Sequence, residues 1–327
     1  MKIPCYAELL QRTDAPPGSS WGVFGPKNQL GTLNFLTPER AIRAASLVRT
    51  GRVFNLDYPI NAFVPSVSGT RPAASHHIFS NNPNHRDDWL DSFYLQSTSQ
   101  VDGLRHIRHP VHGFYGGISD ERVDIGVPDL GMQLMAEKGI VGRGVLLDAV
   151  RYFAQTGEPL SPWTNRRITV DDLEGIAARA RTAIEPGDIL LLYTGWSEAW
   201  LSATADVRAA RKGSPGIGQS HEMLGWLWDH HISVFASDNG GLEAFPVDPN
   251  SGFVIPDEPP PPRGPSHNGM LHRQLIALLG MVIGELWKLD ELAAACAADG
   301  VYEFMLTAKP LNVIGGVGSP PNALAIK

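Results

Sequence analysis

Polar and titratable side chains are concentrated in one short stretch of the chain, LQSTSQVDGLRHIRHPVHGFYGG, from residue 95 to residue 117. If its first part is a β-strand, the alternation of side chains places four polar residues on one face: Gln96, Thr98, Gln100 and Asp102. Four polar groups in a row are unusual for a strand that packs in a core. The stretch is therefore either an edge strand with one face in water or the polar wall of a site.

Three histidines follow within seven positions, beside an arginine and a tyrosine: His106, His109, His112, Arg105 and Tyr115. A lone histidine is usually just a hydrogen-bonded polar residue, but three of them beside Asp102 form an unusually dense group. Imidazole has an ordinary pKa of about 6.5, which suits proton transfer near neutral pH. We therefore predict acid–base chemistry at Asp102 and His106. The predicted substrate contacts are Gln96, Gln100, Arg105, His109 and Tyr115.

Two more carboxylates, Asp238 and Glu243, follow an apolar run in ISVFASDNGGLEAFP. At the end of a strand, such carboxylates often cap a turn. The alternative is that they face the site, where Glu243 would contact a substrate.

The overall composition excludes several classes of function. The 327 residues are 43% hydrophobic and carry a net charge of −7 without a basic run, which argues against binding to nucleic acid or anionic membranes. No apolar stretch has the length of a transmembrane helix or of a signal peptide. The two cysteines form no spacing motif and are expected to be reduced thiols. We expect a cytoplasmic globular protein with a small-molecule substrate.

Strands and helices are mixed along the chain, which indicates an α/β or α+β class. A helix is expected to begin at Thr37 and Pro38, which form a strong capping signal, and to end near Gly51. Strands are expected within residues 52–60, 142–153, 186–196 and 232–239, and further helices within 169–184, 221–231, 268–280 and 290–300. Residues 66–91 and the proline-rich stretch 256–266 are expected to be loops. No glycine-rich phosphate loop is present.

With these elements in place, the stretch from Gln96 to His106 resembles the signature His-x-Gly-Thr-His-x-Asp-x-Pro-x-His of the cyclase family, which includes bacterial kynurenine formamidase and isatin hydrolase. The signature's aspartate falls on Asp102 and its last histidine on His106. Its two leading histidines fall on Gln96 and Gln100. Further blocks resemble the family in the same order, among them GRGVLLD, PGDILLLYTGW, FASDNGGLEAFP and LHRQLIALLGMVIGELWKLDELA, and they cover most of the chain from Trp21 to Ala293.

The resemblance implies a single-domain swivelling β/β/α architecture. Residues 1–50 would form an N-terminal arm and a helix packed on the catalytic domain of residues 51–327. It also implies a homodimer or homotetramer whose subunits help to form each other's sites. In the family, a histidine and a glutamate near the C-terminus complete a metal site, and they match His272 and Glu285. Thirteen residues on one straight helix would set these two roughly 220° apart. They can converge only if the helix ends between them, and Gly280 and Gly284 supply such a break.

The two glutamines affect which metal ion the site would bind. Family members bind zinc or manganese, which activates a water that attacks an amide carbonyl. An amide oxygen is a hard, neutral donor that suits manganese better than zinc. The predicted ligands are Gln100, Asp102, His272 and Glu285, and the alternative is a site without metal.

Three functions remain open. The first is a hydrolase of a small amide, cyclic amide or lactone, acting on C–N bonds with His106 as general acid and base. The second is a metal-independent cyclase or dehydratase that uses the same groups. The third is an inactive homologue that only binds a ligand, although a pure binder would need none of the matched acid–base residues.

Overall fold

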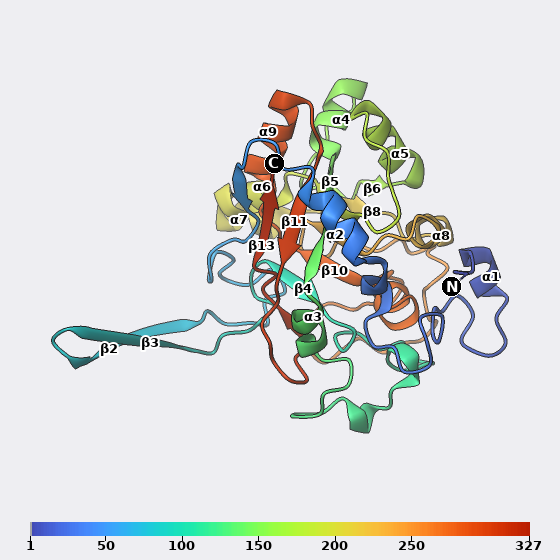
Figure 1. Cartoon of the computed structure of the whole chain (residues 1–327), viewed down its shortest axis with the longest axis horizontal. Coiled ribbons are helices and arrows are strands. Elements are labelled where there is room, and N and C mark those ends of the chain that lie inside the picture. The colour runs from blue at the N-terminus through green and yellow to red at the C-terminus, as the bar shows by residue number, and fades with distance from the viewer. Residues whose placement is uncertain (1) are drawn as a thin grey trace.

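The computed structural model describes residues 2–327. Its centre is a curled, mixed nine-stranded sheet, and helices pack around it (Figure 1). The strand order is β1-β13-β11-β5-β7-β9-β10-β4-β12. The strands of this sheet are β1 (Val53–Asn55), β4 (Gln100–Asp102), β5 (Ile140–Asp148), β7 (Ile189–Tyr193), β9 (Val234–Ser237), β10 (Val282–Glu285), β11 (Glu303–Ala308), β12 (Gly318–Ser319) and β13 (Ala323–Ile326). This is a single-domain α/β fold, as predicted.

The four central strands, β5, β7, β9 and β10, run parallel, and the outer strands pair antiparallel. Their sequences are continuous apolar runs, because a parallel strand is buried on both faces. The first four of the five residues of β7 are fully buried. A second, short parallel pair is formed by β6 (Arg167–Ile168) and β8 (Gly216–Ile217).

Several helix ends lie where local chemistry predicts, but the first predicted helix ends at Ala45 and not near Gly51. Thr37 caps the helix that follows it, with Pro38 in the first turn, and Thr169 forms a capping box with Asp172. The last helix ends at Gly300, which adopts a left-handed conformation. The α-helices are α1 (Tyr6–Leu10), α2 (Pro38–Ala45), α3 (Met132–Lys138), α4 (Ala149–Thr156), α5 (Val170–Arg179), α6 (Trp196–Ser202), α7 (Ala205–Ala210), α8 (His221–Asp229) and α9 (Asp290–Asp299). Within the described residues, no helix has the length and apolar character needed to cross a membrane.

Short helices of other types complete the frame. They are the 3₁₀-helices η1 (Gly31–Phe35), η2 (Tyr115–Gly117) and η3 (Asp120–Arg122) and the segment η4 (Arg273–Leu278). The segment η4 is a π-helix and lies where the sequence predicts an α-helix. Widened turns of this kind are rare and occur often beside functional sites. It ends before Gly280, and β10 follows at once, so the predicted break between His272 and Glu285 is present.

Two predicted elements differ from the structure. The strand expected from residue 95 is limited to β4, because the chain turns between Tyr94 and Ser97, whose backbone groups are hydrogen-bonded. The strand expected in residues 142–153 ends at Asp148, whose carboxylate caps α4. The proline-rich stretch 256–266 contains no helix or strand, as expected.

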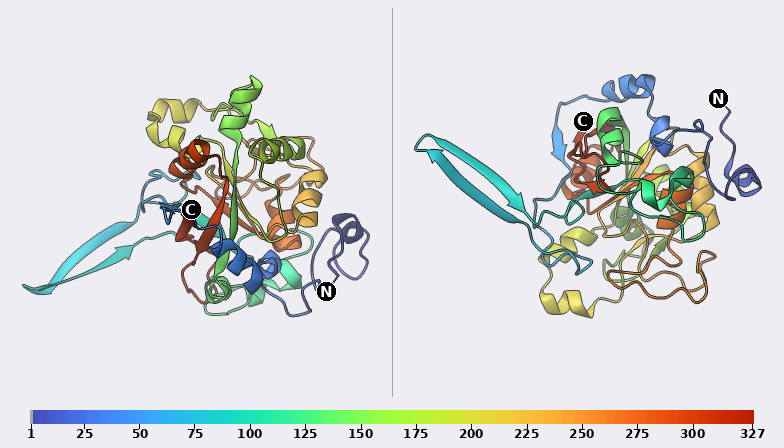
Figure 2. Two further views of the ribbon diagram at one scale, coloured as in Figure 1. Left: turned by 45° about the horizontal axis from the view of Figure 1, so that its top comes forward. Right: turned by 90° about the horizontal axis from the view of Figure 1, so that it is seen from below.

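The largest difference is a hairpin in the stretch expected to be a loop. Strands β2 (Ser75–Asn82) and β3 (His85–Asp91) pair only with each other and form a separate two-stranded sheet. The hairpin projects far from the body of the molecule in every view (Figures 1 and 2). We call residues 75–91 the hairpin arm.

Candidate active site

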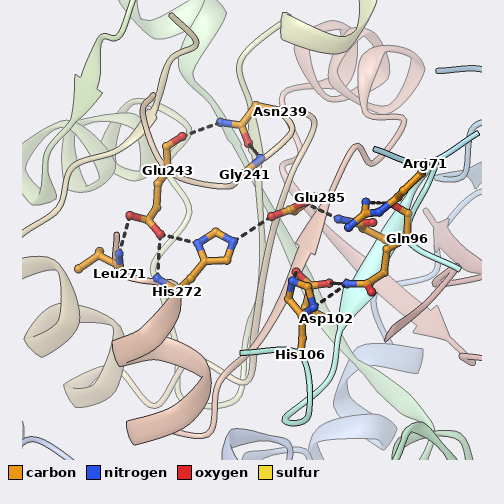
Figure 3. A network of polar contacts seen from close by, with 11 residues as sticks. Arg71, Gln96, Asp102, His106, Asn239, Gly241, Glu243, Leu271, His272 and Glu285 are labelled. Atoms are coloured by element: carbon orange, nitrogen blue, oxygen red, sulfur yellow. Dashed lines mark hydrogen bonds and ion pairs between the residues drawn. The ribbon is translucent and has the colours of Figure 1, made fainter. Parts of the chain in front are cut away.

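A group of buried polar residues lies where β4, β10 and the start of η4 meet (Figure 3). The antiparallel register pairs Glu285 with Gln100 and Ile283 with Asp102. Paired residues in a sheet point to the same face, as do residues two apart along one strand. The register therefore turns Gln100, Asp102 and Glu285 to one side.

The third acidic residue of the group holds the imidazole in place. Glu243 is buried, and its carboxylate accepts hydrogen bonds from the backbone N–H groups of Leu271 and His272 at 2.6 and 2.9 Å. Its Oε1 also lies 2.6 Å from Nδ1 of His272. Because both of its oxygens are engaged, Glu243 orients His272. Its predicted contact with a substrate stays a prediction.

His272 bridges two carboxylates. Its Nε2 lies 3.0 Å from Oε1 of Glu285, on the ring edge opposite Glu243. Burial alone would lower the pKa of His272, but the hydrogen bonds and charges of Glu243 and Glu285 outweigh it and raise the pKa to about 10. The imidazole is thus a cation at neutral pH. In return, its hydrogen bond and charge lower the pKa of Glu285 despite the burial of that carboxyl.

The two glutamines donate hydrogen bonds to the carboxylates. The side-chain amide of Gln100 donates to Oε2 of Glu285, and that of Gln96 donates to Oδ1 of Asp102. The Gln96 amide nitrogen also lies 3.1 Å from Nδ1 of His106. Gln96 reaches this position across Gly318, where a Cβ atom would come within 2.6 Å of its side chain.

Two buried oxygens of this group have no hydrogen-bond partner within the described residues: Oδ2 of Asp102 and Oε1 of Gln100. Leaving such atoms unpaired costs about 1–3 kcal/mol each, so they indicate a missing partner. Burial raises the pKa of Asp102, and the charge of Glu285 adds to this effect. Nε2 of His106 lies 3.8 Å from the unpaired Oδ2.

A buried group of three side chains could hold a metal ion. Ligand atoms of Asp102, His272 and Glu285 lie within 4.8 Å of one another. One imidazole, two carboxylates and the unpaired oxygens of Asp102 and Gln100 fit a divalent cation that accepts several oxygen ligands. His272 would have to release its proton to bind it.

His106 is the accessible member of the group, because 18% of its side chain is exposed whereas that of Asp102 is fully buried. A second imidazole, His267, lies beside it at the end of the proline-rich loop. The ring centre of His267 is 6.4 Å from that of His106 and 5.3 Å from that of His272. Burial and the positive charge of His272 lower the pKa of His267 to about 3, so this ring is neutral.

The sequence did not point to His267 or to Arg71. The guanidinium of Arg71 donates to the backbone carbonyl of Gln96, and its charge contributes to lowering the pKa of Glu285. Both residues come from segments with no strand or helix pattern, at positions 66–91 and 256–267. Only their proximity in space identifies them.

Three residues that were predicted to contact a substrate make structural contacts with neighbouring loops. Arg105 is buried and donates to the backbone carbonyls of Asp124 and Val127. Tyr115 is buried against Gly280, with its hydroxyl 3.3 Å from that of Ser20. His109 stacks on His112 and accepts backbone hydrogen bonds from the turn that follows it. These contacts hold the loops around the site, and contact of the three side chains with a substrate stays a prediction.

The comparisons with known proteins bear on the family and the fold. The family model described as "Putative cyclase" matches residues 55–244. A crystal structure described as a novel cyclase is 32% identical, covers 94% of this chain and 99% of its own, and superposes with a TM-score of 0.80. The chain belongs to the cyclase family.

More distant solved structures share the fold. Isatin hydrolase A from Ralstonia solanacearum is 18% identical, with coverage of 89% of this chain and 98% of its own and a TM-score of 0.57. Isatin hydrolase A from Labrenzia aggregata, bound to benzyl benzoate, is 17% identical, with coverage of 86% and 94% and a TM-score of 0.56. No curated protein matches the chain significantly. The predicted family and fold are confirmed.

Proposed function

We propose that this member of the cyclase family is a hydrolase that opens a small amide, cyclic amide or lactone with an activated water. The observation that carries this proposal is the buried group of Asp102, His272 and Glu285, with an unpaired carboxylate oxygen and the accessible His106 beside it. Such a group combines ligands for a cation with a proton-transfer residue within reach of a substrate.

Asp102, His272, Glu285 and the amide oxygen of Gln100 are the residues that would hold a divalent metal. The donor set is richer in oxygen than in nitrogen, which favours manganese over zinc. A metal bound there would supply a water of lowered pKa for attack on the carbonyl carbon. The protein fixes these ligands from two paired strands and one helix start, so they need little rearrangement.

His106 is the proton donor in this mechanism. The Gln96 amide donates to Oδ1 of Asp102 and lies 3.1 Å from Nδ1 of His106, so it holds the imidazole beside the carboxylate. The ring takes up the proton that the attacking water loses and becomes an imidazolium. When the C–N or C–O bond of the tetrahedral intermediate breaks, the imidazolium gives this proton to the leaving nitrogen or oxygen, and the carboxylic acid product forms. Arg71 supplies positive charge for the developing oxyanion.

One observation favours a second candidate, a metal-independent cyclase or dehydratase. Both glutamine amides donate to the carboxylates, and His272 is a buried cation between two of them. These groups balance the negative charge without a metal ion. In an elimination, Asp102 would accept a proton from carbon, and His106 would protonate the departing hydroxyl to release water.

Metal content separates the two candidates. The protein should be purified, measured by elemental mass spectrometry and titrated with Mn²⁺ and Zn²⁺. For the hydrolase, we expect near-stoichiometric binding of Mn²⁺ that is lost in Asp102→Ala. A protein that takes up neither ion would contradict the metal-assisted mechanism and leave the metal-independent one.

Turnover separates an enzyme from a binding protein. A panel of N-aryl formamides, cyclic amides and lactones serves as the substrate set. His106→Gln should reduce kcat about 10²–10⁴-fold, because it removes a general acid. His112→Gln is the matched control and should keep kcat, since that ring only stacks on His109. Binding of a panel member without turnover, with equal affinity in both variants, would refute the enzymatic proposal.

A further inference from the structure

A hollow of about 250 Å³ lies beside the carboxyl end of β5, where it is lined by residues of α4, α5 and α9. These three helices lie together at the top of the view in Figure 1. In α/β sheets, ligands usually bind outside the carboxyl ends of the strands. The candidate active site lies at the end of β10, three strands further along the sheet, which is roughly 14 Å at the usual strand spacing. No residue of the buried group lines the hollow, so the two places are separate.

Three exposed arginines line the hollow without a charged partner. They are Arg151, Arg179 and Arg181, and none of them forms an ion pair within the described residues. Their one side-chain hydrogen bond runs from Nε of Arg179 to Oε1 of Gln155 at 2.8 Å. The whole chain carries a net charge of −7, so three unpaired guanidinium groups at one hollow give it a local positive potential. Guanidinium groups match the oxygens of carboxylates and phosphates in geometry and charge.

Two buried polar groups form the floor of the hollow. Asp148 and Tyr302 line it and are only 6% and 7% exposed. Oδ1 of Asp148 accepts a hydrogen bond from the backbone N–H of Arg151 at 2.9 Å, and its Oδ2 has no partner within the described residues. Burial raises the pKa of both groups, and the nearby charge of Arg151 opposes this effect. A hydroxyl group in the hollow could donate to Asp148 and accept from Tyr302, which would satisfy both.

We propose that the hollow is a second binding site, which takes a small metabolite with an anionic group at one end and hydroxyl groups at the other. The arginines bind the anionic group, which is a phosphate or a carboxylate. Asp148 and Tyr302 bind the hydroxyl groups, and the buried side chain of Ile176 supplies an apolar wall for the carbon chain. The volume lies just below the range of roughly 300–1,000 Å³ that holds drug-sized ligands, so it fits a smaller molecule.

The test is calorimetric titration of the full chain at constant ionic strength. Glycerol 3-phosphate and glycerate are the probes for the two kinds of anion, and glycerol is the neutral control. We expect one of the two anions to bind at a ratio of one per chain and glycerol not to bind. Arg151→Gln and Arg181→Gln should each weaken this binding roughly tenfold or more, because each removes a charged hydrogen-bond donor. The anion that binds more tightly identifies the ligand as a phosphate or as a carboxylate.

Arg49→Gln is the matched control for the arginines. Arg49 is also exposed and has no ion pair within the described residues, but it does not line the hollow, so its replacement should leave the affinity unchanged. Two outcomes would overturn the site. One is that neither anion binds, and the other is that binding is unchanged in Arg151→Gln/Arg181→Gln, which would place the anion elsewhere on the chain.

The floor has a test of its own, in which inorganic phosphate is compared with glycerol 3-phosphate. Wild type should bind glycerol 3-phosphate roughly fivefold more tightly, because the hydroxyl groups add hydrogen bonds. Asp148→Asn keeps the oxygen that caps α4 and removes the charge. It should bind phosphate more tightly and lose most of the preference. Tyr302→Phe removes only a hydroxyl and should also reduce the preference. A preference that persists in both variants would overturn the roles assigned to these two residues.

Discussion

The charge of the candidate site is governed by one imidazole. His272 lies between Glu243 and Glu285, and their charges keep it protonated far above the ordinary pKa of histidine. A metal ion needs the same Nε2 atom in its neutral form. Metal binding and proton release are therefore linked at this residue.

This linkage predicts a measurable release of protons. Because the pKa of His272 is about 10, binding of Mn²⁺ should release close to one proton between pH 7 and 9, and the release should fall towards zero as the pH rises through 10. The affinity should rise up to about tenfold per pH unit over the same range. Calorimetric titrations in two buffers of different ionisation enthalpy measure the proton number directly.

Glu243→Gln is the control for this effect. It removes a charge next to Nδ1 of His272 and keeps a hydrogen-bond acceptor there. The pKa of His272 should fall, so fewer protons should be released at pH 8. An unchanged proton number in Glu243→Gln would show that another group releases the proton.

A second prediction concerns replacement of the two glutamines. Gln96→His/Gln100→His restores the imidazoles of the family signature, and nitrogen ligands suit zinc. We expect the affinity for Zn²⁺ to rise by at least about tenfold relative to Mn²⁺. Competition titrations with a zinc chelator measure this ratio. Ser97→His places an imidazole on a neighbouring residue and should not change it.

The sequence was enough to infer the positions of several site residues but not the roles of others. The signature placed Asp102 and His106, and the predicted break at Gly280 allowed His272 to meet Glu285. The roles of Glu243 and Arg105 depend on which backbone groups they meet, and no sequence pattern carries that information. Alternation along a presumed strand placed Gln96 beside Gln100, whereas a turn brings it to Asp102.

Among the elements, η1 and the start of β10 meet at an unusually close contact. A Cβ atom on Gly31 would lie 1.9 Å from the carbonyl oxygen of Gly280, and Gly31 has a positive φ of 52°. The next residue, Thr32, donates its backbone N–H to that same oxygen at 2.9 Å. The contact fixes the chain just before the strand that carries Glu285.

We therefore expect Gly31→Ala to lower the free energy of unfolding by about 2–4 kcal/mol, from overpacking together with backbone strain. Gly51→Ala is the matched control, since Gly51 also has a positive φ but nothing within 4 Å of the added Cβ. It should cost only about 1–2 kcal/mol for the left-handed backbone. Urea unfolding curves compare the two. Equal losses would argue against the close contact.

The predictability of the elements follows from burial. Buried strands such as β7 and capped helices such as α5 have strong patterns, because packing and hydrogen bonding at their ends restrict the residues they can use. The hairpin arm has no such pattern, since SHHIFSNN and HRDDWLD mix polar and apolar residues on both faces. An element that does not lie on the core does not show the alternation expected of a strand that packs there.

At the scale of the whole molecule, the hairpin arm and the candidate site are joined by a few residues of chain. The arm is preceded by Arg71, four residues before β2, and Gln96 follows five residues after β3. Arg71 also bonds to the backbone of Gln96, whose amide contacts Asp102 and His106. Movement of the arm would therefore be transmitted to both ends of this connection.

This connection makes the turnover of the candidate site depend on residues that lie outside it. If the ends of the arm shift, Arg71 and Gln96 shift with them, and the contacts of Gln96 with Asp102 and His106 are disturbed. Replacement of residues 76–90 by a short Gly-Ser turn should therefore lower kcat, although none of these residues belongs to the buried group.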